Sequence, residues 1–356
     1  MHSETVSINA GSRQPRIFER LTAAQLAAWL AAAGIIAVTR VLFVPQRFAD
    51  YETYVLLIDN VYHGMSRLGF TVEPVFAALF LAVRVITGNT DAAADLLQYG
   101  LTALFLLSLY FLIRAYRAEW PAVFVTLGLF APLLAFVTIR ATPAYAVMAL
   151  AVLFAFQGRL ITIPALLVAG LFHPSSVLGV IPVLILLAQR RYGWLGWLNT
   201  HASRIIAVLV VLAVIATALQ TIVVNAMLDA LSSIGQLSKY IVYLESTEVS
   251  SQSGTIDQVS IYDRIYSMLI VITTVVAFAQ KEPRMVVMRS YILVSFTIFL
   301  LLSFSPVAAF RQSIFWFIPL LLTFPWRSAG VRGPVALGLM LASVALFIFQ
   351  LSSVLA

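Results

Sequence analysis

Long apolar segments follow one another along almost the whole chain, and they constrain its fold more than any other feature. About 20 apolar residues in an α-helix cross the hydrocarbon core of a bilayer. Of the 356 residues, 62% are hydrophobic and 10% are charged, whereas a soluble domain is about half apolar and about a quarter charged. This composition excludes a water-soluble enzyme, a disordered protein and a secreted domain held together by disulfides.

Eleven of these segments are candidate spans, and they predict an all-α polytopic membrane protein. They lie near residues 21–44, 93–113, 120–138, 141–156, 160–173, 174–189, 203–225, 263–280, 288–305, 311–326 and 334–355. The first apolar run is longer than the core of a signal peptide. We therefore expect residues 1–20 to form a cytoplasmic tail and residues 21–356 to form a single integral membrane domain. The chain shows no internal repeat, which disfavours a transporter built from inverted repeats.

The segment 73–87 is too short for an ordinary span, at about 15 residues. It is either a tilted span or a re-entrant helix that enters and leaves on one side. If the N-terminus is cytoplasmic and this segment does not cross, 14 of the 22 basic residues lie in the cytoplasm, namely Arg13, Arg16, Arg20, Arg114, Arg117, Arg159, Arg190, Arg191, Arg204, Lys281, Arg284, Arg289, Arg327 and Arg332. A crossing segment would place the loop clusters outside. The positive-inside rule therefore favours the re-entrant interpretation.

Several classes of site are absent from the sequence. The chain has no cysteine, no GxxxxGK[ST], no GxGxxG, no HExxH and no DxD pair, so nucleotide-dependent chemistry and thiol chemistry are not expected. The net charge of +7 reflects the cytoplasmic loops, so we expect no nucleic-acid partner. We predict no cofactor and assign no metal site, because one carboxylate beside Tyr51 is too few ligands to argue for a cation; the metal requirement stays open.

The predicted topology places two long polar loops, residues 45–72 and 226–262, on the outer side. Apolar and aromatic residues in the first loop recur at helical spacing, which predicts an amphipathic helix at the membrane interface. Asp50 precedes this helix, and Glu73 precedes Pro74. Two roles stay open for both carboxylates: capping a helix, or acting as a general base or metal ligand.

Isolated cationic residues and a histidine lie at the outer ends of three spans: Arg140, His173 and Arg311. A charge near the bilayer is costly, so an arginine there is a functional candidate. The alternative is a side chain that snorkels to the interface, which we expect for Arg40 and Arg84. For His173, the alternative is a structural hydrogen bond.

Lys239, Tyr240 and Tyr243 lie close together in the second outer loop, in the sequence QLSKYIVYLE. They predict either an aromatic belt with a solvated lysine or a contact with a sugar or phosphate. The following stretch, residues 245–259, is typical of a flexible loop that closes over a substrate.

Six short motifs occur in the order found in one known family: DYETY, EP at 73–74, IRATPAYAVMAL, LFHPSSVLGVIPVL, SKYIVY and FRQSIFWF. Over roughly residues 40–325 the chain resembles the EpsG family of bacterial polysaccharide polymerases. That family is related in role to the Wzy O-antigen polymerases and is similar to the GT-C membrane glycosyltransferases. The chain has Val75 where the family often has glycine, and the loop at 245–260 has no match, so acceptor specificity stays open.

The resemblance implies glycosyl transfer between polyprenyl-diphosphate-linked oligosaccharides, on the outer, periplasmic face of the bacterial inner membrane. Asp50 would be the general base, with Glu73 as the alternative. The diphosphate would be bound by Arg140, His173, Lys239 and Arg311, and the sugars by Tyr51, Tyr54, Tyr240 and Tyr243. The donor lipid already carries the activated bond. Expected partners are the glycan donor and acceptor, the lipid bilayer, and a flippase and chain-length regulator of the same pathway.

Three other functions fit parts of the sequence. A single-sugar GT-C transferase would use a polyprenyl-phosphate sugar, and a transporter of lipid-linked glycans would carry out no chemistry. A transporter should place charges near the bilayer midplane, whereas here they gather at one side. A membrane acyltransferase ranks last, because His173 lies between Phe172 and Pro174 rather than in a polar cluster.

Overall fold

The computed structural model describes residues 21–42, 51–64, 73–137, 140–193, 196–218, 222, 256–302, 306–326 and 334–355. Every regular element in these ranges is a helix. The elements are α1 (Ala23–Leu42), α2 (Tyr51–Tyr62), α3 (Pro74–Thr87), α4 (Thr90–Tyr116), α5 (Trp120–Pro132), the π-helix η2 (Leu133–Val137), α6 (Thr142–Phe156), α7 (Thr162–Phe172), the 3-10 turn η3 (Pro174–Ser176), α8 (Val177–Tyr192), α9 (Gly196–Ala218), α12 (Ile256–Ala279), α13 (Pro283–Leu301), α14 (Pro306–Thr323) and α15 (Pro334–Leu355).

Each of the apolar segments predicted to span the membrane overlaps one of these helices. Among the described residues, three helices are long and apolar enough to cross a bilayer unaided: α1, α4 and α13. Several shorter apolar helices accompany them, including α3, α5, α6 and α7. The all-helical fold is therefore confirmed, and the helices fit a polytopic membrane protein. The number of spans and the GT-C-like architecture stay predictions.

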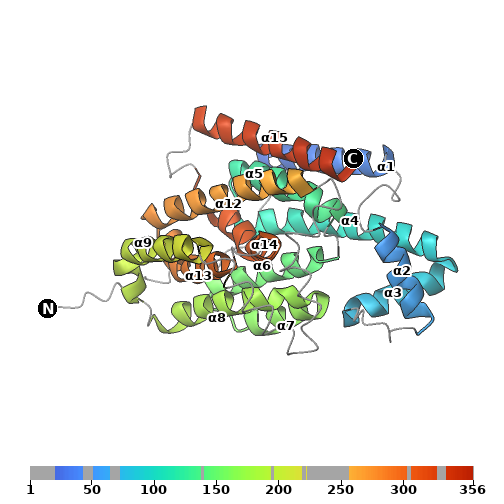
Figure 1. Ribbon diagram of the computed structural model, residues 1–356, viewed down its shortest axis with the longest axis horizontal. Coiled ribbons are helices and arrows are strands. Elements are labelled where there is room, and N and C mark those ends of the chain that lie inside the picture. The colour runs from blue at the N-terminus through green and yellow to red at the C-terminus, as the bar shows by residue number, and fades with distance from the viewer. Residues whose placement is uncertain are drawn as a thin grey trace.

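The helices form one main bundle and a smaller cluster at one end of it. In the bundle, α6 and α14 lie centrally, with α13 and α8 on one side and α5, α1 and α15 on the other (Figure 1). Its core contains large aromatic side chains such as Trp316 and Phe130, each 1% exposed. Close helix contacts depend on small residues: a Cβ atom on Gly128 of α5 would overlap the backbone of Ser343 of α15.

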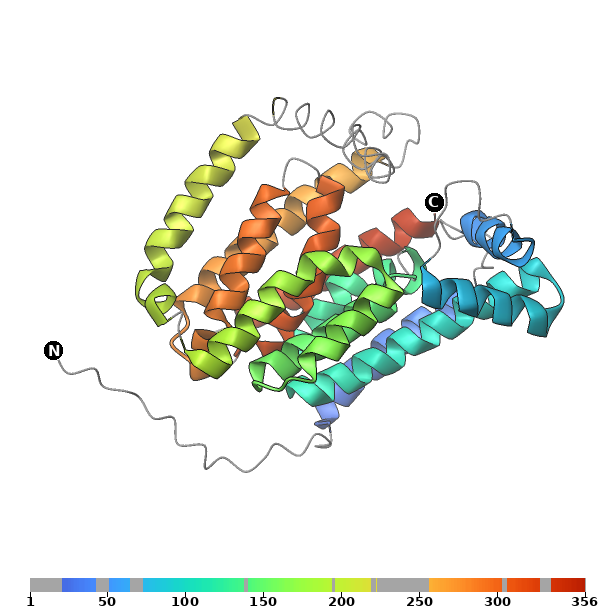
Figure 2. The same cartoon turned by 90° about the horizontal axis from the view of Figure 1, so that it is seen from below.

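The smaller cluster consists of α2, α3 and the first turns of α4. The aromatic and aliphatic side chains of α2 and α3, including Tyr54, Phe76 and Phe80, are buried against α4. The predicted helix in the first outer loop is thus confirmed as α2. Its apolar face packs against α3 and α4, which differs from the predicted position on the membrane interface. Figure 2 shows this cluster projecting from one end of the bundle.

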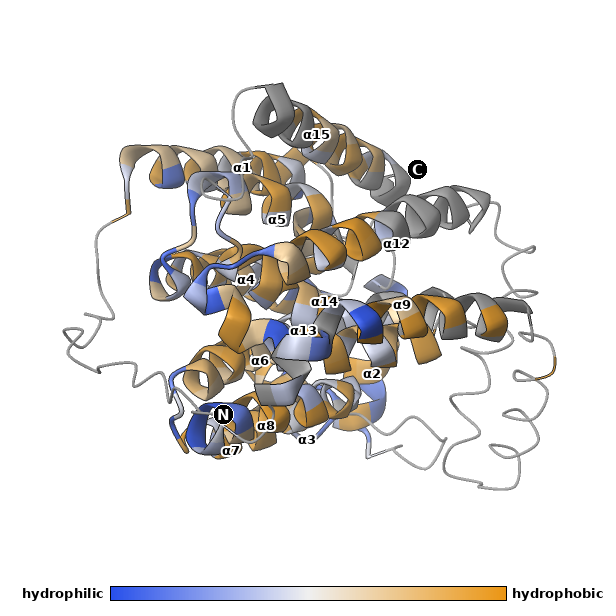
Figure 3. Cartoon of the chain, turned by 90° about the vertical axis from the view of Figure 1, so that its left-hand side faces the viewer, coloured by the Kyte–Doolittle hydropathy of each residue, from blue (hydrophilic) through white to orange (hydrophobic). Residues whose placement is uncertain are grey.

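Of the basic residues predicted to be cytoplasmic, Arg114 and Arg117 at the end of α4, Arg159 after α6 and Arg191 at the end of α8 lie at the opposite end (Figure 2). There the Gln25 side chain of α1 donates to the carbonyl of Ala118, which follows α4. The Arg191 guanidinium at the end of α8 donates to the carbonyl of Gly158, after α6, at 3.4 Å. Figure 3 faces this end and shows helices that are hydrophobic along their lengths, with hydrophilic residues near their ends. The two ends of the bundle therefore differ in chemistry, which is consistent with the predicted topology.

Helix α3 is short, but α7 is shorter still, so helix length alone does not decide whether α3 crosses the membrane. The 14 residues of α3 extend about 21 Å, less than the roughly 30 Å of the hydrocarbon core. Gly88 ends the helix with φ +67°, a conformation that glycine adopts without strain. The Asn89 side chain then caps α4 by accepting from the amides of Asp91 and Ala92. The chain thus turns into α4 beside α2 (Figure 2).

Reporter fusions test this topology. Because α2, α3 and the start of α4 pack together, fusions near residues 60 and 90 are expected to report the same, outer face. A reporter active only outside the cytoplasm, such as alkaline phosphatase, measures this directly. Cytoplasmic reporter activity near residue 90 would contradict the re-entrant interpretation and move every later loop across the membrane.

One predicted boundary is wrong. The sequence was expected to form a loop over residues 226–262, but α12 begins at Ile256. Polar residues in its first turns concealed the helix, although Ile256, Val259 and Tyr266 recur at helical spacing. Residues 256–259 of the predicted flexible loop 245–259 therefore belong to α12. The rest of that predicted loop lies outside the described residues.

Candidate functional site

Three of the predicted site residues meet at the end of the bundle opposite the basic loops. The Glu73 Oε2 atom lies 3.7 Å from Nη1 of Arg140, and Glu73 Oε1 lies 3.8 Å from Nε2 of His173. Glu73 precedes α3, Arg140 precedes α6 and His173 follows α7. Residues far apart in the sequence are thus brought together by the ends of short helices.

Glu73 occupies the N-cap position of α3 but does not cap it. Its side chain makes no capping hydrogen bond, and Pro74 supplies no N–H group at the next position. The carboxylate is 9% exposed, and its Oε2 atom has no hydrogen-bond partner among the described residues. Buried polar atoms are nearly always paired. Of the two roles left open by the sequence, the structure therefore disfavours capping; Oε2 is itself buried beside Arg140 in this conformation.

His173 is held with a defined face toward Glu73. Pro174 disfavours a helical conformation at the preceding residue, and His173 is extended, with φ −157° and ψ 126°. Its Nδ1 atom accepts the Ser175 amide N–H at 3.3 Å and lies 2.6 Å from the Ser175 hydroxyl oxygen. Since a nitrogen that accepts an N–H carries no proton, the neutral ring carries its proton on Nε2. That N–H faces Glu73.

Helix α2 positions the main chain of Arg140. The Arg140 amide donates to the Tyr54 hydroxyl oxygen at 3.1 Å, and the Tyr54 ring packs edge-to-face against Phe80. Tyr51 also uses its hydroxyl locally, donating to the Asp91 carbonyl at 3.4 Å. Both tyrosines are about 5% exposed or less, so neither offers a free ring face in this conformation. Their role as sugar platforms stays a prediction, and Tyr54 gains a positioning role.

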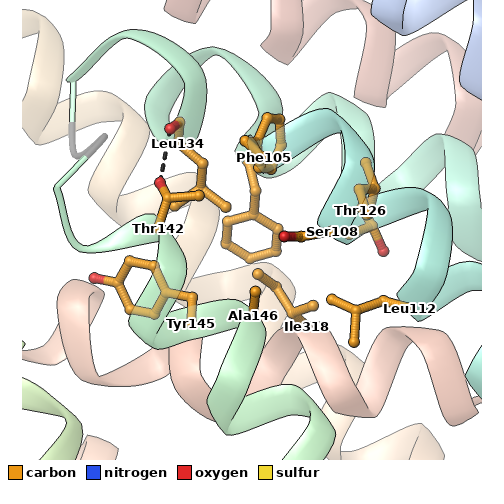
Figure 4. A pocket seen from close by; sticks show the side chains of 11 residues that line it. Phe105, Ser108, Leu112, Thr126, Leu134, Thr142, Tyr145, Ala146 and Ile318 are labelled. Carbon is orange, nitrogen blue, oxygen red and sulfur yellow. Dashed lines mark hydrogen bonds between the residues drawn. The ribbon is translucent and has the colours of Figure 1, made fainter. Parts of the chain in front are cut away.

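A π-helix leads into Arg140. Pro132 lacks an amide hydrogen and disturbs the end of α5, and the five residues Leu133–Val137 continue as the π-helix η2. π-helical turns are frequent at functional sites. The Leu134 carbonyl of η2 accepts the Thr142 hydroxyl at 2.7 Å (Figure 4). This bond ties the segments before and after Arg140 to each other.

The expectation that Arg40 snorkels to the interface is wrong. Arg40 is 2% exposed, and its guanidinium donates to Gln98 Oε1 at 2.7 Å and to Thr102 Oγ1 at 3.1 Å. It also donates to the Ala135 carbonyl of η2 at 2.8 Å. The sequence held a signal for this network, because Gln98 and Thr102 lie one turn apart on one helical face of an apolar segment.

Arg84, the other arginine expected to snorkel, has local partners at the end of α3. Its Nε donates to the Thr90 hydroxyl at 3.0 Å, and its guanidinium lies 4.4 Å from the ring centre of Tyr62. None of these contacts connects Arg84 to Glu73. Arg84 is thus an arginine near the same end of the bundle but outside the cluster.

The remaining predicted site residues are only partly accessible to structural description. Asp50, Lys239, Tyr240 and Tyr243 lie outside the described residues. The backbone of Arg311 belongs to α14, a helix that packs against η3, the turn that follows His173. Their roles stay predictions. The described part of the chain contains no group of three metal-ligating side chains of the His, Cys, Asp or Glu type.

A small cavity beneath η2 does not serve as the substrate site. It measures about 20 Å³ and is lined mainly by apolar side chains of α4, α5 and α6, with Thr142 at its edge (Figure 4). This volume suits about one water molecule, far less than a sugar or a diphosphate requires. The polar cluster of Glu73, Arg140 and His173 is therefore the stronger candidate.

Comparison with known proteins agrees with the resemblance seen in the sequence motifs. The model of the EpsG family matches residues 31–355, nearly the whole chain. No curated protein and no solved structure matches the chain. The match covers every element of the candidate site, from Arg40 to α14. The chain therefore belongs to the EpsG family, a family of membrane polysaccharide polymerases of exopolysaccharide biosynthesis.

Proposed function

We propose that the chain joins polyprenyl-diphosphate-linked oligosaccharide units by glycosyl transfer, at the outer face of a bacterial inner membrane. One observation carries the proposal. A buried carboxylate, Glu73, lies between an arginine and a histidine, and one of its oxygens has no hydrogen-bond partner among the described residues. Such a group suits proton abstraction from an acceptor hydroxyl.

The reaction balances with the groups in this cluster. The acceptor hydroxyl oxygen bonds to C1 of the donor's reducing-end sugar, and the bond between C1 and the diphosphate oxygen breaks. The bonding pair leaves with the polyprenyl diphosphate, and the hydroxyl proton passes to Oε2 of Glu73. Because the donor bond is already activated, no nucleotide enters the reaction.

Arg140 is proposed to stabilise the departing diphosphate. Its 3.7 Å separation from Glu73 is longer than a charge-assisted hydrogen bond, which is about 2.7–2.9 Å. The side chain is 30% exposed, so its donors can turn to a phosphate without breaking a tight bond. An arginine fits this role because its planar fork binds phosphate oxygens in pairs. Lys239 and Arg311 are proposed to add further positive charge.

His173 is proposed to orient the carboxylate. Its Nε2–H faces Oε1 of Glu73, while Ser175 holds the other ring nitrogen. Oε2, which lies beside Arg140 and is buried in this conformation, is proposed to take the acceptor proton once Arg140 turns to the diphosphate. Asp50 remains the alternative base, because it directly precedes Tyr51 in α2, the helix that contacts Arg140 through Tyr54.

The lengths of two helices support a substrate anchored in the membrane. Helices α6 and α7, which have 15 and 11 residues, extend about 22 Å and about 16 Å. Helix α6 ends shortly before Arg159 and α7 begins shortly after it, at the basic end of the bundle. With Arg159 at the cytoplasmic surface, Arg140 and His173 lie below the outer surface of a core about 30 Å thick. A diphosphate on a polyprenyl chain reaches this depth more readily than a soluble sugar donor.

The products of the purified protein test the reaction class. With a lipid-linked repeat unit as both donor and acceptor, mass spectrometry is expected to show a ladder of lipid-linked chains that differ by whole repeat units. Addition of one monosaccharide from a polyprenyl-phosphate sugar would contradict the proposal and indicate a single-sugar transferase. Boiled protein is the control for spontaneous transfer.

A further inference from the structure

We infer that Arg40 is a positioning residue for glycosyl transfer: it holds the π-helix η2 so that Arg140 lies beside Glu73. This inference rests on the proposed function of Glu73 and Arg140. Arg40 is 2% exposed, so it does not touch substrate in this conformation. Its effect on the reaction must pass through the residues that it binds.

The guanidinium of Arg40 joins three parts of the bundle. Arg40 lies in the last turn of α1. Its Nε and Nη1 atoms donate to Thr102 and Gln98, one turn apart on α4. Its Nη2 atom donates to the main-chain carbonyl of Ala135 in η2. A buried charge is retained without great cost only when its donors are satisfied, and each nitrogen of this guanidinium has an acceptor.

The end of η2 needs these donors. The last carbonyls of a helix have no amide partners within the helix, and they carry a partial negative charge. The Ala135 carbonyl accepts both from Arg40 at 2.8 Å and from the Thr102 hydroxyl at 3.2 Å. The guanidinium carbon also lies 4.9 Å from the ring centre of Phe136, within range of a cation–π interaction. Arg40 thus fixes both the main chain and a side chain of η2.

The clamp on η2 acts on the site because Arg140 follows η2 closely in the sequence. Leu134 is tied to Thr142 on the far side of Arg140, and the Arg140 amide is held by Tyr54. The guanidinium of Arg140 therefore projects from a segment anchored on both sides. A displacement of about 1 Å at a reacting group reduces turnover by about 10²-fold, so release of η2 should lower kcat.

Two variants test the role of Arg40. Arg40→Met keeps the aliphatic stem and removes all three donors, and we expect kcat per folded protein to fall by about 10²-fold. Thr102→Val is nearly isosteric and removes both hydroxyl bonds but leaves the Arg40 bonds to Gln98 and Ala135 in place, so we expect a smaller fall of about 3- to 10-fold. If Arg40→Met does not give monodisperse protein in detergent, the result for Thr102→Val decides.

Matched controls separate positioning from general packing. Trp29→Phe removes another bond from α1 to a main-chain carbonyl, that of Leu106 at 3.1 Å. Thr126→Val makes the same substitution at a buried threonine whose hydroxyl has no hydrogen-bond partner among the described residues. Both controls are expected to keep kcat within about twofold, as for changes that leave buried hydrogen bonds at the site intact.

A double-mutant cycle provides a readout that a purely structural role would not change. Arg140→Lys keeps a charge but removes the planar fork, so residual turnover is measurable. If Arg40 acts through Arg140, adding Arg40→Met to Arg140→Lys lowers kcat by much less than Arg40→Met alone. The inference would be overturned if Arg40→Met lowered kcat by the same factor in the Arg140→Lys background as in the unmodified protein. Full turnover in Arg40→Met or Thr102→Val would also overturn it. Full turnover in Glu73→Gln would instead overturn the proposed site, and the inference with it.

Discussion

Replacing Glu73 with glutamine is expected to reduce polymer formation by about 10²–10⁴-fold, the range that a general base contributes. The amide keeps the size of the side chain but cannot accept the acceptor's proton. Gel analysis of the polymer from cells carrying the variant measures the effect, and immunoblotting of the membrane fraction confirms insertion. Full polymer length in Glu73→Gln would contradict the assignment.

A similar pair on α2 supplies the control for Glu73→Gln. Asp59 Oδ1 lies 3.3 Å from Nδ1 of His63, and the two side chains are 42% and 50% exposed. Exposed pairs of this kind contribute about 0–1 kcal/mol, so Asp59→Asn is expected to leave polymer formation unchanged. Asp50→Asn tests the alternative base: loss of polymer in that variant, together with a fully active Glu73→Gln, would move the catalytic role to Asp50.

Arg140→Ala is expected to lower polymer formation by about 10²–10³-fold, the loss typical of removing one donor to a developing negative charge. Arg140→Lys should fall between this variant and the unmodified protein, because lysine supplies the charge without the paired donors. The polymer ladder and turnover of the purified protein measure both.

Arg84→Ala is the matched control for Arg140→Ala. Arg84 lies on α3, donates to Thr90 and stacks on Tyr62, but it makes no contact with Glu73 in the described structure. Its replacement is expected to leave turnover near that of the unmodified protein. Equal losses in Arg84→Ala and Arg140→Ala would show that positive charge in general, rather than the Arg140 contact, determines activity.

Much of the fold was predictable because bilayer length and hydropathy limit the choices. The apolar segments located the helices, and Glu73, Arg140 and His173 stood out as polar groups at their outer ends. The contact among the three was not predictable, since it depends on how α3, α6 and α7 pack. Helical spacing does not distinguish a buried tyrosine ring from an exposed one, so the burial of Tyr54 was not predictable from the sequence.

Arg40 shows where sequence reasoning failed. An arginine at the end of an apolar helix can snorkel or be buried, and only its partners decide between the two. Those partners are Gln98, Thr102 and the Ala135 carbonyl. The carbonyl is available because Pro132 precedes a π-helix, which hydropathy does not reveal. The early start of α12 was missed for a related reason, because its polar first turns resemble a loop.

The most direct test of the transfer site is turnover by purified protein in detergent, with a lipid-linked repeat unit as the sole substrate. Release of polyprenyl diphosphate and formation of glycosidic bonds are measured together, for the unmodified protein, Glu73→Gln and Asp59→Asn. The proposed mechanism predicts that the unmodified protein and Asp59→Asn turn over substrate and release one polyprenyl diphosphate per glycosidic bond formed. It predicts that turnover is largely lost in Glu73→Gln. Intact substrate after incubation with the unmodified protein, or equal turnover in Glu73→Gln, would contradict it.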